Sequence, residues 1–305
     1  MLLPEVASRT LHPAPPESYT IFTGGCNFKC LHCQNWSISQ YPDNGMRVDG
    51  FVNPAALARE AVSAIESPAG RLMGADRIFF SGGEPTIHLP YIEKVVFEAR
   101  KLNRSCKVNF DTNGFMTESS LERILDFTTS MTFDIKAYHD EIHRAMTGAP
   151  VEPVLRNAEI VATRAPEKLW EYRIVVIPGV NEEDVGPICR FLARLSGDLP
   201  VCFLAFRPNF VMENHPRASR GLMTKCLSLA SEAGLRNTAW AGVTGLPGSF
   251  RNIDTLSDAA YERAGAKTAG SYASSHGCET HPRDCGTCPA SDACTIKRII
   301  PGKSC

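Results

Sequence analysis

Three cysteines near the N-terminus lie at a spacing that allows their thiolates to bind metal. Cys26, Cys30 and Cys33 are separated by three and then two residues. Three thiolates at this spacing can ligate three irons of a cubic iron–sulfur cluster and leave the fourth iron open. A zinc site with His32 as fourth ligand is the alternative, although a position next to Cys33 is awkward for ligation. Plain buried cysteines are a further alternative.

A second group of cysteines lies near the C-terminus. The chain has 12 cysteines, and five of them fall between Cys278 and Cys305. In a reducing compartment, cysteines clustered at short spacing are more typical of metal sites than of disulfides. We expect a second iron–sulfur cluster or a mononuclear iron or zinc here, and a redox-sensitive tail without metal is the alternative. The expected ligands are Cys278, Cys285, Cys288 and Cys294.

Glycines and acidic residues follow the second, third and fourth apolar runs of the chain. Residues 81–86 read Ser-Gly-Gly-Glu-Pro-Thr, in which two glycines allow a close backbone approach and Glu84 can meet an ammonium group. Asp111 and Asp134 end two neighbouring runs, and such carboxylates repel each other unless a cation lies between them. A plain glycine-rich turn and a surface pair of Asp134 with Lys136 are the alternatives.

The elements that must position these residues alternate regularly. Alternation of short apolar runs with amphipathic helical patterns implies parallel strands joined by right-handed crossovers. Six such units predict an α/β fold, a partial (β/α)6 barrel with its reactive groups at the carboxyl ends of the strands. A seventh strand is possible at 236–243. The expected strands are 19–22, 77–80, 107–110, 131–135, 173–177 and 201–206, and the expected helices are 54–66, 90–102, 119–127, 151–164, 182–195 and 221–233.

Composition divides the chain into three expected parts. Residues 1–16 are rich in proline and predict an extended N-terminal arm, and residues 17–247 form the barrel. Residues 248–305 form a cysteine-rich C-terminal extension with little periodicity. Such a segment buries too little apolar surface to fold alone, so we expect it to need its metal.

Overall composition excludes several classes of protein. The chain has 305 residues, 43% hydrophobic and 21% charged, with a formal net charge of -1. This balance excludes a disordered chain, and the neutral charge argues against nucleic-acid binding driven by phosphate neutralisation. The sequence contains no apolar run long enough for a membrane span and no secretory signal. We therefore expect a soluble cytoplasmic protein with no nucleic-acid or membrane partner.

The cysteine loop and the motifs after it resemble the radical S-adenosylmethionine (SAM) superfamily, from about residue 19 to about residue 235. Within it, the resemblance is closest to the activating enzymes of glycyl radical enzymes. It implies a 4Fe-4S cluster on Cys26, Cys30 and Cys33 that binds the amino and carboxylate groups of SAM. An electron, supplied originally by an external one-electron donor, then cleaves SAM to a 5′-deoxyadenosyl radical.

The resemblance also implies cofactor contacts. The aromatic before the second cysteine, Phe28, is expected near the adenine, and the glycine-rich motif near the methionyl amino group. The matching aspartates bind a monovalent cation in the family, with Thr112 and the backbone of Thr132 beside them. Arg207 stands where the activating enzymes carry a histidine. The implied cofactor-binding residues are Phe28, Gly82, Gly83, Glu84, Asp111, Thr112, Asn113, Asp134, Lys136, Arg173 and Arg207; no further catalytic side chain is singled out.

The whole chain, barrel plus cysteine-rich tail, is similar to the methanogen radical enzymes that methylate unactivated carbons of methyl-coenzyme M reductase. This resemblance implies a cobalamin-dependent C-methyltransferase acting on a protein or peptide, with the Cα of a glutamine in that reductase as the specific target. The alternative is a glycyl-radical-enzyme activating enzyme, which abstracts hydrogen from a protein glycine without cobalamin. A non-catalytic iron–sulfur carrier is a third hypothesis, but a carrier needs neither the glycine-rich motif nor the paired aspartates.

Overall fold

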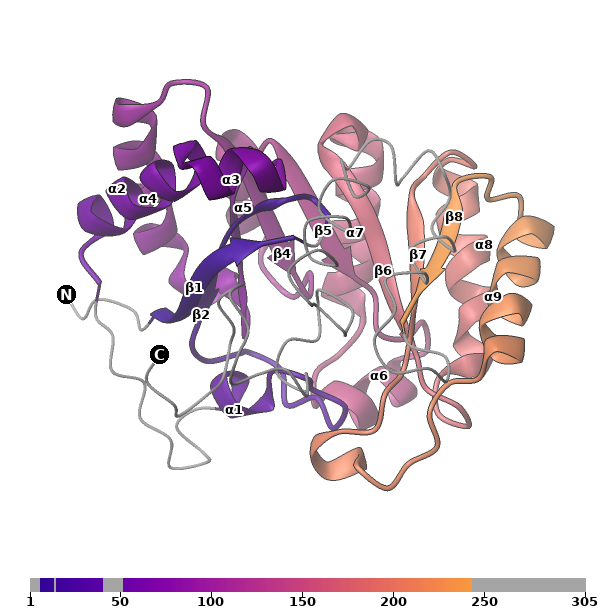
Figure 1. The fold of residues 1–305 in the computed structure, drawn as a ribbon. Coiled ribbons are helices and arrows are strands. Elements are labelled where there is room, and N and C mark those ends of the chain that lie inside the picture. Colours follow the sequence, from indigo (N-terminus) through magenta and orange to yellow (C-terminus); the bar gives the residue numbers. More distant parts are fainter. Residues whose placement is uncertain (1–5, 14, 41–51, 243–305) are drawn as a thin grey trace.

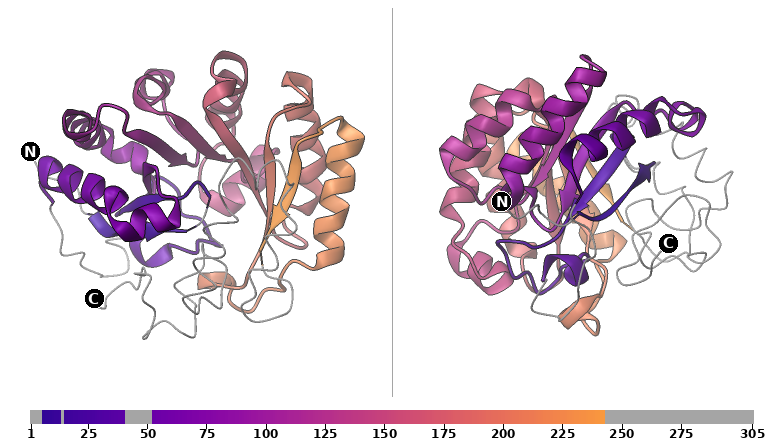
Figure 2. Two further views of the ribbon diagram at one scale, coloured as in Figure 1. Left: turned by 45° about the horizontal axis from the view of Figure 1, so that its top comes forward. Right: turned by 90° about the vertical axis from the view of Figure 1, so that its left-hand side faces the viewer.

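A computed structural model describes residues 6–13, 15–40 and 52–242 of the chain. These residues form an α/β fold around one curved sheet, with helices packed along its outer face (Figure 1). The left view of Figure 2 shows the helices arranged in an arc around the strands. The expected partial barrel is therefore confirmed. No described helix has both the length and the apolar composition needed to cross a bilayer.

The sheet has eight strands whose order in space is their order in sequence. The first two pair antiparallel, and every later pair is parallel. Parallel neighbours place all their carboxyl ends at one edge of the sheet, where a site can form. The strands are β1 (Val6–His12), β2 (Ser18–Thr23), β3 (Arg77–Gly82), β4 (Lys107–Thr112), β5 (Ser130–Asp134), β6 (Leu169–Val176), β7 (Val201–Ala205) and β8 (Thr238–Ala241).

Helices connect the strands and begin at recognisable caps. Asn53 accepts hydrogen bonds from the amides of Ala55 and Ala56, and Pro54 fixes the first turn of α2. The α-helices are α1 (Trp36–Ser39), α2 (Pro54–Glu66), α3 (Pro68–Met73), α4 (Leu89–Leu102), α5 (Glu118–Phe127), α6 (Asp140–Thr147), α7 (Glu152–Arg164), α8 (Val185–Leu195) and α9 (Arg220–Ala233). Short 3-10 helices are η1 (Pro85–His88), η2 (Pro166–Lys168), η3 (Glu182–Asp184) and η4 (Phe210–Met212).

The expected elements are present, and four unexpected ones, α1 among them, join them in addition to short 3-10 helices. The six predicted strands correspond to β2 through β7, and the possible seventh strand is β8. Part of the expected N-terminal arm forms β1, which pairs with β2. The helices α3 and α6 were not predicted. The extension from residue 248 onward lies outside the described residues.

The two faces of the parallel strands differ in polarity. In β6, the side chains of Tyr172, Ile174 and Val176 are fully buried, and the Tyr172 hydroxyl donates to the carbonyl of Ala158 in α7. The alternate residue Arg173 points to the opposite, inner face, where it meets carboxylates of neighbouring strands. The outer face therefore holds the sheet to its helices, and the inner face is free to carry polar groups.

Glu17 lies directly before β2, and its buried carboxyl group should make the stability of the protein depend on pH. Its side chain is buried, one carboxyl oxygen has no hydrogen-bond partner among the described residues, and burial raises its pKa to about 7. A raised carboxyl pKa means that the folded chain binds the proton more tightly than the unfolded chain. Stability is thus retained below the unfolded pKa and lost as the pH rises toward and through about 7.

We expect Glu17→Gln to be more stable than the parent protein at pH 8 by roughly 1–3 kcal/mol, with the difference vanishing near pH 4. Denaturant unfolding at a series of pH values measures this. Glu159→Gln, at an exposed position of α7, is the matched control and should not change the profile. Parallel pH profiles for the parent and the Glu17 variant would contradict the assignment.

Candidate functional site

The three N-terminal cysteines lie in the loop after β2, at the carboxyl edge of the sheet. Cys30 is buried, Cys26 and Cys33 are partly buried, and all three are free thiols. Burial raises the pKa of each thiol, that of Cys30 to about 12. Because metals bind thiolates, loading this site must release protons.

The donor set fits the cluster that the resemblance implies. The charges of Cys30 and Cys33 raise the pKa of Cys26, and the charge of Cys33 raises that of Cys30, so the three sulfurs lie near one another. Among the described residues, however, no three His, Cys, Asp or Glu side chains are gathered closely enough to hold a single metal ion. Thiolates that each ligate a different iron lie further apart than the ligands of one ion. The three cysteines of the loop match the number of thiolates that a cluster with one open iron takes.

The cysteine loop is held in place independently of its sulfurs. The amides of Lys29 and Leu31 donate to the carbonyls of Thr147 and Met146 at 2.8 and 3.1 Å, at the end of α6. Both α1 and α6 lie at the lower edge of the molecule in Figure 1, the edge to which this loop belongs. The loop thus keeps its course whether or not the thiols are ligated.

Phe28 anchors the same loop from inside. Its ring is 1% exposed and packs against Phe115 and His143, with ring centroids 5.4 and 5.3 Å away. The side chain therefore lies in the core, and its ring does not stand open at the mouth of the barrel. That Phe28 packs near an adenine stays a prediction.

The glycine-rich motif after β3 packs directly on the cysteine loop. The amide of Gly83 donates to the carbonyl of Thr23 at 2.9 Å, and the amide of Glu84 donates to that of Gly25 at 3.0 Å. A Cβ atom at Gly83 would lie 1.8 Å from the Gly25 carbonyl oxygen, and Gly82 has a φ of +123°. Glycine is thus required here by the approach of two backbones.

Glu84 joins two loops of the site through hydrogen bonds. Its carboxylate is 1% exposed and accepts from the amide and hydroxyl of Thr86, the hydroxyl of Thr112 and the amide of Asn113. Burial raises its pKa, while these donors act in the opposite direction. The side chain joins the loop after β3 to the end of β4, and its contact with an ammonium group stays a prediction. Glu84 is therefore a positioning residue.

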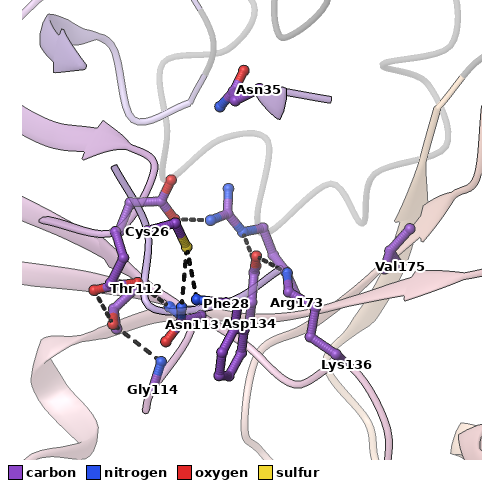
Figure 3. A network of polar contacts seen from close by, with 12 residues as sticks. Cys26, Phe28, Asn35, Thr112, Asn113, Gly114, Asp134, Lys136, Arg173 and Val175 are labelled. Carbon is purple, nitrogen blue, oxygen red and sulfur yellow. Dashed lines mark hydrogen bonds and ion pairs between the residues drawn. The ribbon is translucent and has the colours of Figure 1, made fainter. Parts of the chain in front are cut away.

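Asn113 links that end of β4 to the cysteine loop (Figure 3). Its side-chain amide donates to the Asn27 carbonyl oxygen at 2.8 Å and lies 3.8 Å from the Cys26 sulfur. The Phe28 amide also donates to that sulfur, at 3.3 Å. Hydrogen bonds to a ligating sulfur tune the potential of an iron–sulfur cluster, so both groups are placed to do so.

The paired aspartates come together as expected, but an arginine lies between them. Arg173 donates from Nε to Asp134 Oδ1 at 2.9 Å, and its Nη2 forms an ion pair with Asp111 Oδ1. Lys136 Nζ donates to Asp134 Oδ2 at 2.7 Å (Figure 3). Burial opposes the charge on Lys136, but the Asp134 carboxylate and the neighbouring thiolates of Cys30 and Cys33 together raise the lysine pKa. The network carries two negative and two positive charges.

The other residues expected at the site are Arg207 and the cysteines of the tail. Arg207 follows β7, where burial and the neighbouring charge of Arg217 lower its pKa. It therefore shares its surroundings with a second arginine. The expected metal ligands of the tail lie outside the described residues; they are Cys278, Cys285, Cys288 and Cys294.

Sequence reasoning considered His32 only as a zinc ligand and missed two polar residues beside the motifs, Asn35 and Ser81. His32 is fully buried, burial lowers its pKa to about 3, and its Nδ1 has no hydrogen-bond partner among the described residues. It is thus a neutral ring within the cysteine loop. The side-chain amide of Asn35 donates to the Gly82 carbonyl at 3.0 Å, and the Ser81 hydroxyl donates to Asp111 at 2.7 Å. Only the positions of Asn35 and Ser81 next to the motifs could have indicated these contacts from the sequence.

Comparison with known proteins places this site in context. A family model described as the radical SAM superfamily matches residues 20–192, more than half of the chain. An uncharacterised protein of Methanocaldococcus jannaschii is 27% identical over 229 residues, 74% of this chain and 63% of that protein. The pyruvate formate-lyase-activating enzyme of Staphylococcus aureus is 29% identical over 178 residues, 55% of this chain and 65% of the enzyme. The chain therefore spans less than two thirds of the length of either relative.

Solved structures extend the likeness to the fold. SuiB of Streptococcus suis bound to S-adenosylmethionine matches with a TM-score of 0.54 and 13% identity, over 71% of this chain and 48% of SuiB. SuiB bound to its precursor peptide SuiA matches with a TM-score of 0.53 and 14% identity, over 71% of this chain and 46% of SuiB. At such identities the comparison establishes a shared fold.

Proposed function

The chain belongs to the radical SAM superfamily, and from that membership we propose that it modifies a protein or peptide. We further propose that the modification is cobalamin-dependent C-methylation of an unactivated carbon, with the glutamine Cα of methyl-coenzyme M reductase as the target. Membership implies a 4Fe-4S cluster and SAM. When bound, the cluster supplies the electron that cleaves SAM to a hydrogen-abstracting radical.

One observation carries the enzymatic part of the proposal: the cysteine loop, the glycine-rich loop and a charged network meet at the carboxyl edge of the sheet. Cys26, Cys30 and Cys33 supply the thiolates for three irons. Glu84 fixes the neighbouring loops by accepting four hydrogen bonds. Arg173 and Lys136, both partly buried, supply fixed positive charge for a carboxylate such as that of SAM.

The nature of two relatives supports a protein or peptide substrate. The S. aureus relative is named for activating pyruvate formate-lyase, and SuiB binds the precursor peptide SuiA. The choice of methylation rests on the resemblance of the barrel plus tail to the methanogen enzymes. In this proposal residues 17–247 form the barrel and residues 248–305 bind a metal through Cys278, Cys285, Cys288 and Cys294.

The second candidate function is activation of a glycyl radical enzyme. The specific observation in its favour is the 29% identity to the pyruvate formate-lyase-activating enzyme. Such an enzyme abstracts hydrogen from a protein glycine and has no use for cobalamin. The two candidates therefore differ in a second cofactor and in the product.

The test is a reaction of the full chain under anaerobic conditions with SAM, a chemical reductant and a peptide covering the reductase glutamine. We expect mass spectrometry to find the peptide heavier by one methyl group in place of a hydrogen, only when hydroxocobalamin is added. A cobalamin-independent glycyl radical signal on a pyruvate formate-lyase-type protein, without methylation, would favour the second candidate instead.

A double variant tests the role of the tail in the same assay. Replacing both Cys285 and Cys288 by Ser removes two of the expected tail ligands but leaves the barrel cysteines unchanged. We expect the variant to cleave SAM and to form no methylated peptide, because the tail loses the metal that orders it. Unchanged metal content together with normal product would contradict a metal site in residues 248–305.

A further inference from the structure

We propose that Arg173 is the built-in counter-cation of this site, so that SAM binds without a monovalent metal ion. The resemblance implied such an ion between Asp111 and Asp134, but the guanidinium of Arg173 lies there instead. The proposal rests on SAM binding, which family membership implies, and is independent of which product the enzyme makes.

Strand register explains how one side chain reaches both carboxylates. Arg173 lies opposite Asp134 in the pairing of β5 with β6, and Asp111 lies opposite Thr132 in the pairing of β4 with β5. Arg173 therefore extends from β6 across β5 to β4. An arginine is long enough to span one intervening strand, and its planar fork can meet two carboxylates at once.

Three of the four carboxylate oxygens accept a hydrogen bond from the protein, and the fourth, Asp111 Oδ1, has no hydrogen-bond donor among the described residues and meets only the Arg173 guanidinium in an ion pair. Arg173 contacts one oxygen of each aspartate, the Ser81 hydroxyl donates to Asp111 Oδ2 at 2.7 Å, and Lys136 donates to Asp134 Oδ2 at 2.7 Å. Figure 3 shows Asp134 between Arg173 and Lys136. A metal ion would have to displace these partners to obtain its ligands.

The Thr112 side chain, another expected ligand of a cation, is engaged as well. The Thr112 hydroxyl donates to Glu84 at 2.8 Å and accepts from the Gly114 amide at 3.0 Å. The Thr112 hydroxyl is thus committed to the loops beside the site.

Charge and burial make the metal ion and Arg173 mutually exclusive. The two carboxylates are balanced by one guanidinium and one ammonium, and the Arg173 side chain is only 12% exposed. An arginine cannot lose its proton in a protein, so a metal ion between the same carboxylates would face a permanent like charge at close range. Partial burial leaves little solvent to screen that repulsion.

The test is SAM affinity in different salts, measured by titration calorimetry on the cluster-loaded full chain. Ionic strength is held constant with potassium, sodium or choline chloride, and choline is too large for a metal site. We expect the affinity of the parent protein to agree within about twofold across the three salts, because screening alone changes little at constant ionic strength. An affinity that rises roughly tenfold from choline to potassium would overturn the proposal.

Arg173→Met is the informative variant because it removes the charge and keeps most of the apolar stem. We expect its SAM affinity in choline to fall by roughly tenfold or more, since two carboxylates lose their shared partner. Potassium should restore part of the loss in this variant alone. Unchanged affinity in choline would overturn the proposal. Circular dichroism checks its fold, and if it does not fold, the salt series on the parent protein still decides.

Discussion

Replacing any one of Cys26, Cys30 and Cys33 by Ala should abolish SAM cleavage without unfolding the barrel. Each thiolate is expected to ligate a different iron, so each loss removes a corner of the cluster. The loop itself should persist, because the amides of Lys29 and Leu31 bond to α6. Iron content, circular dichroism and the yield of 5′-deoxyadenosine by mass spectrometry measure the three effects separately.

The matched control is Cys106→Ala, at a buried free cysteine just before β4. This variant should keep the cluster and cleave SAM at the rate of the parent protein, because Cys106 has no place in the cysteine loop. Normal cleavage in any of the three loop variants would reject the ligand set. Loss of cleavage in the control as well would show that the effect is not specific to the loop.

Glu84→Ala should be among the most destabilising single changes in the described part of the chain. The carboxylate accepts from Thr86, Thr112 and Asn113, and its removal leaves buried donors without an acceptor. We expect the free energy of unfolding to fall by about 2–4 kcal/mol. Because the same carboxylate positions the loops at the site, SAM affinity should fall in whatever fraction folds.

Denaturant unfolding of the cluster-free protein measures the loss of stability without interference from the metal. Glu122→Gln is a suitable control, since it changes an exposed glutamate on helix α5. The control should unfold within about 0.5 kcal/mol of the parent protein. A Glu84 variant as stable as this control would show that the four hydrogen bonds do not hold the two loops together.

Most of the barrel was predictable because its parallel strands are buried on at least one face and read as short apolar runs. Edge strand β1 was not, since it contains Ser8, Arg9 and Thr10 and becomes a strand only by pairing with β2. Strand β6 begins earlier than predicted because Glu171 faces the polar interior and interrupts the apolar pattern. Helix α6 is short and strongly polar at its start, so its periodicity was weak.

The site was predictable where a motif follows a strand and unpredictable where two distant side chains meet. The spacing of the cysteines and the position of Asp111 and Asp134 at neighbouring strand ends follow from the sequence. That Arg173 reaches both aspartates depends on strand register and side-chain length, which no local pattern reports. The hydrogen bonds of Glu84 could not be predicted for the same reason, because two of its donors come from the end of β4.

The central claim is that the cysteine edge of the barrel holds a cluster that cleaves SAM reductively. Its most direct test is to incubate the anaerobically reconstituted full chain with SAM and dithionite and to quantify the products by mass spectrometry. We predict equal amounts of 5′-deoxyadenosine and methionine, formed only with reductant present. Intact SAM in protein that carries its full complement of iron and sulfide would contradict the claim.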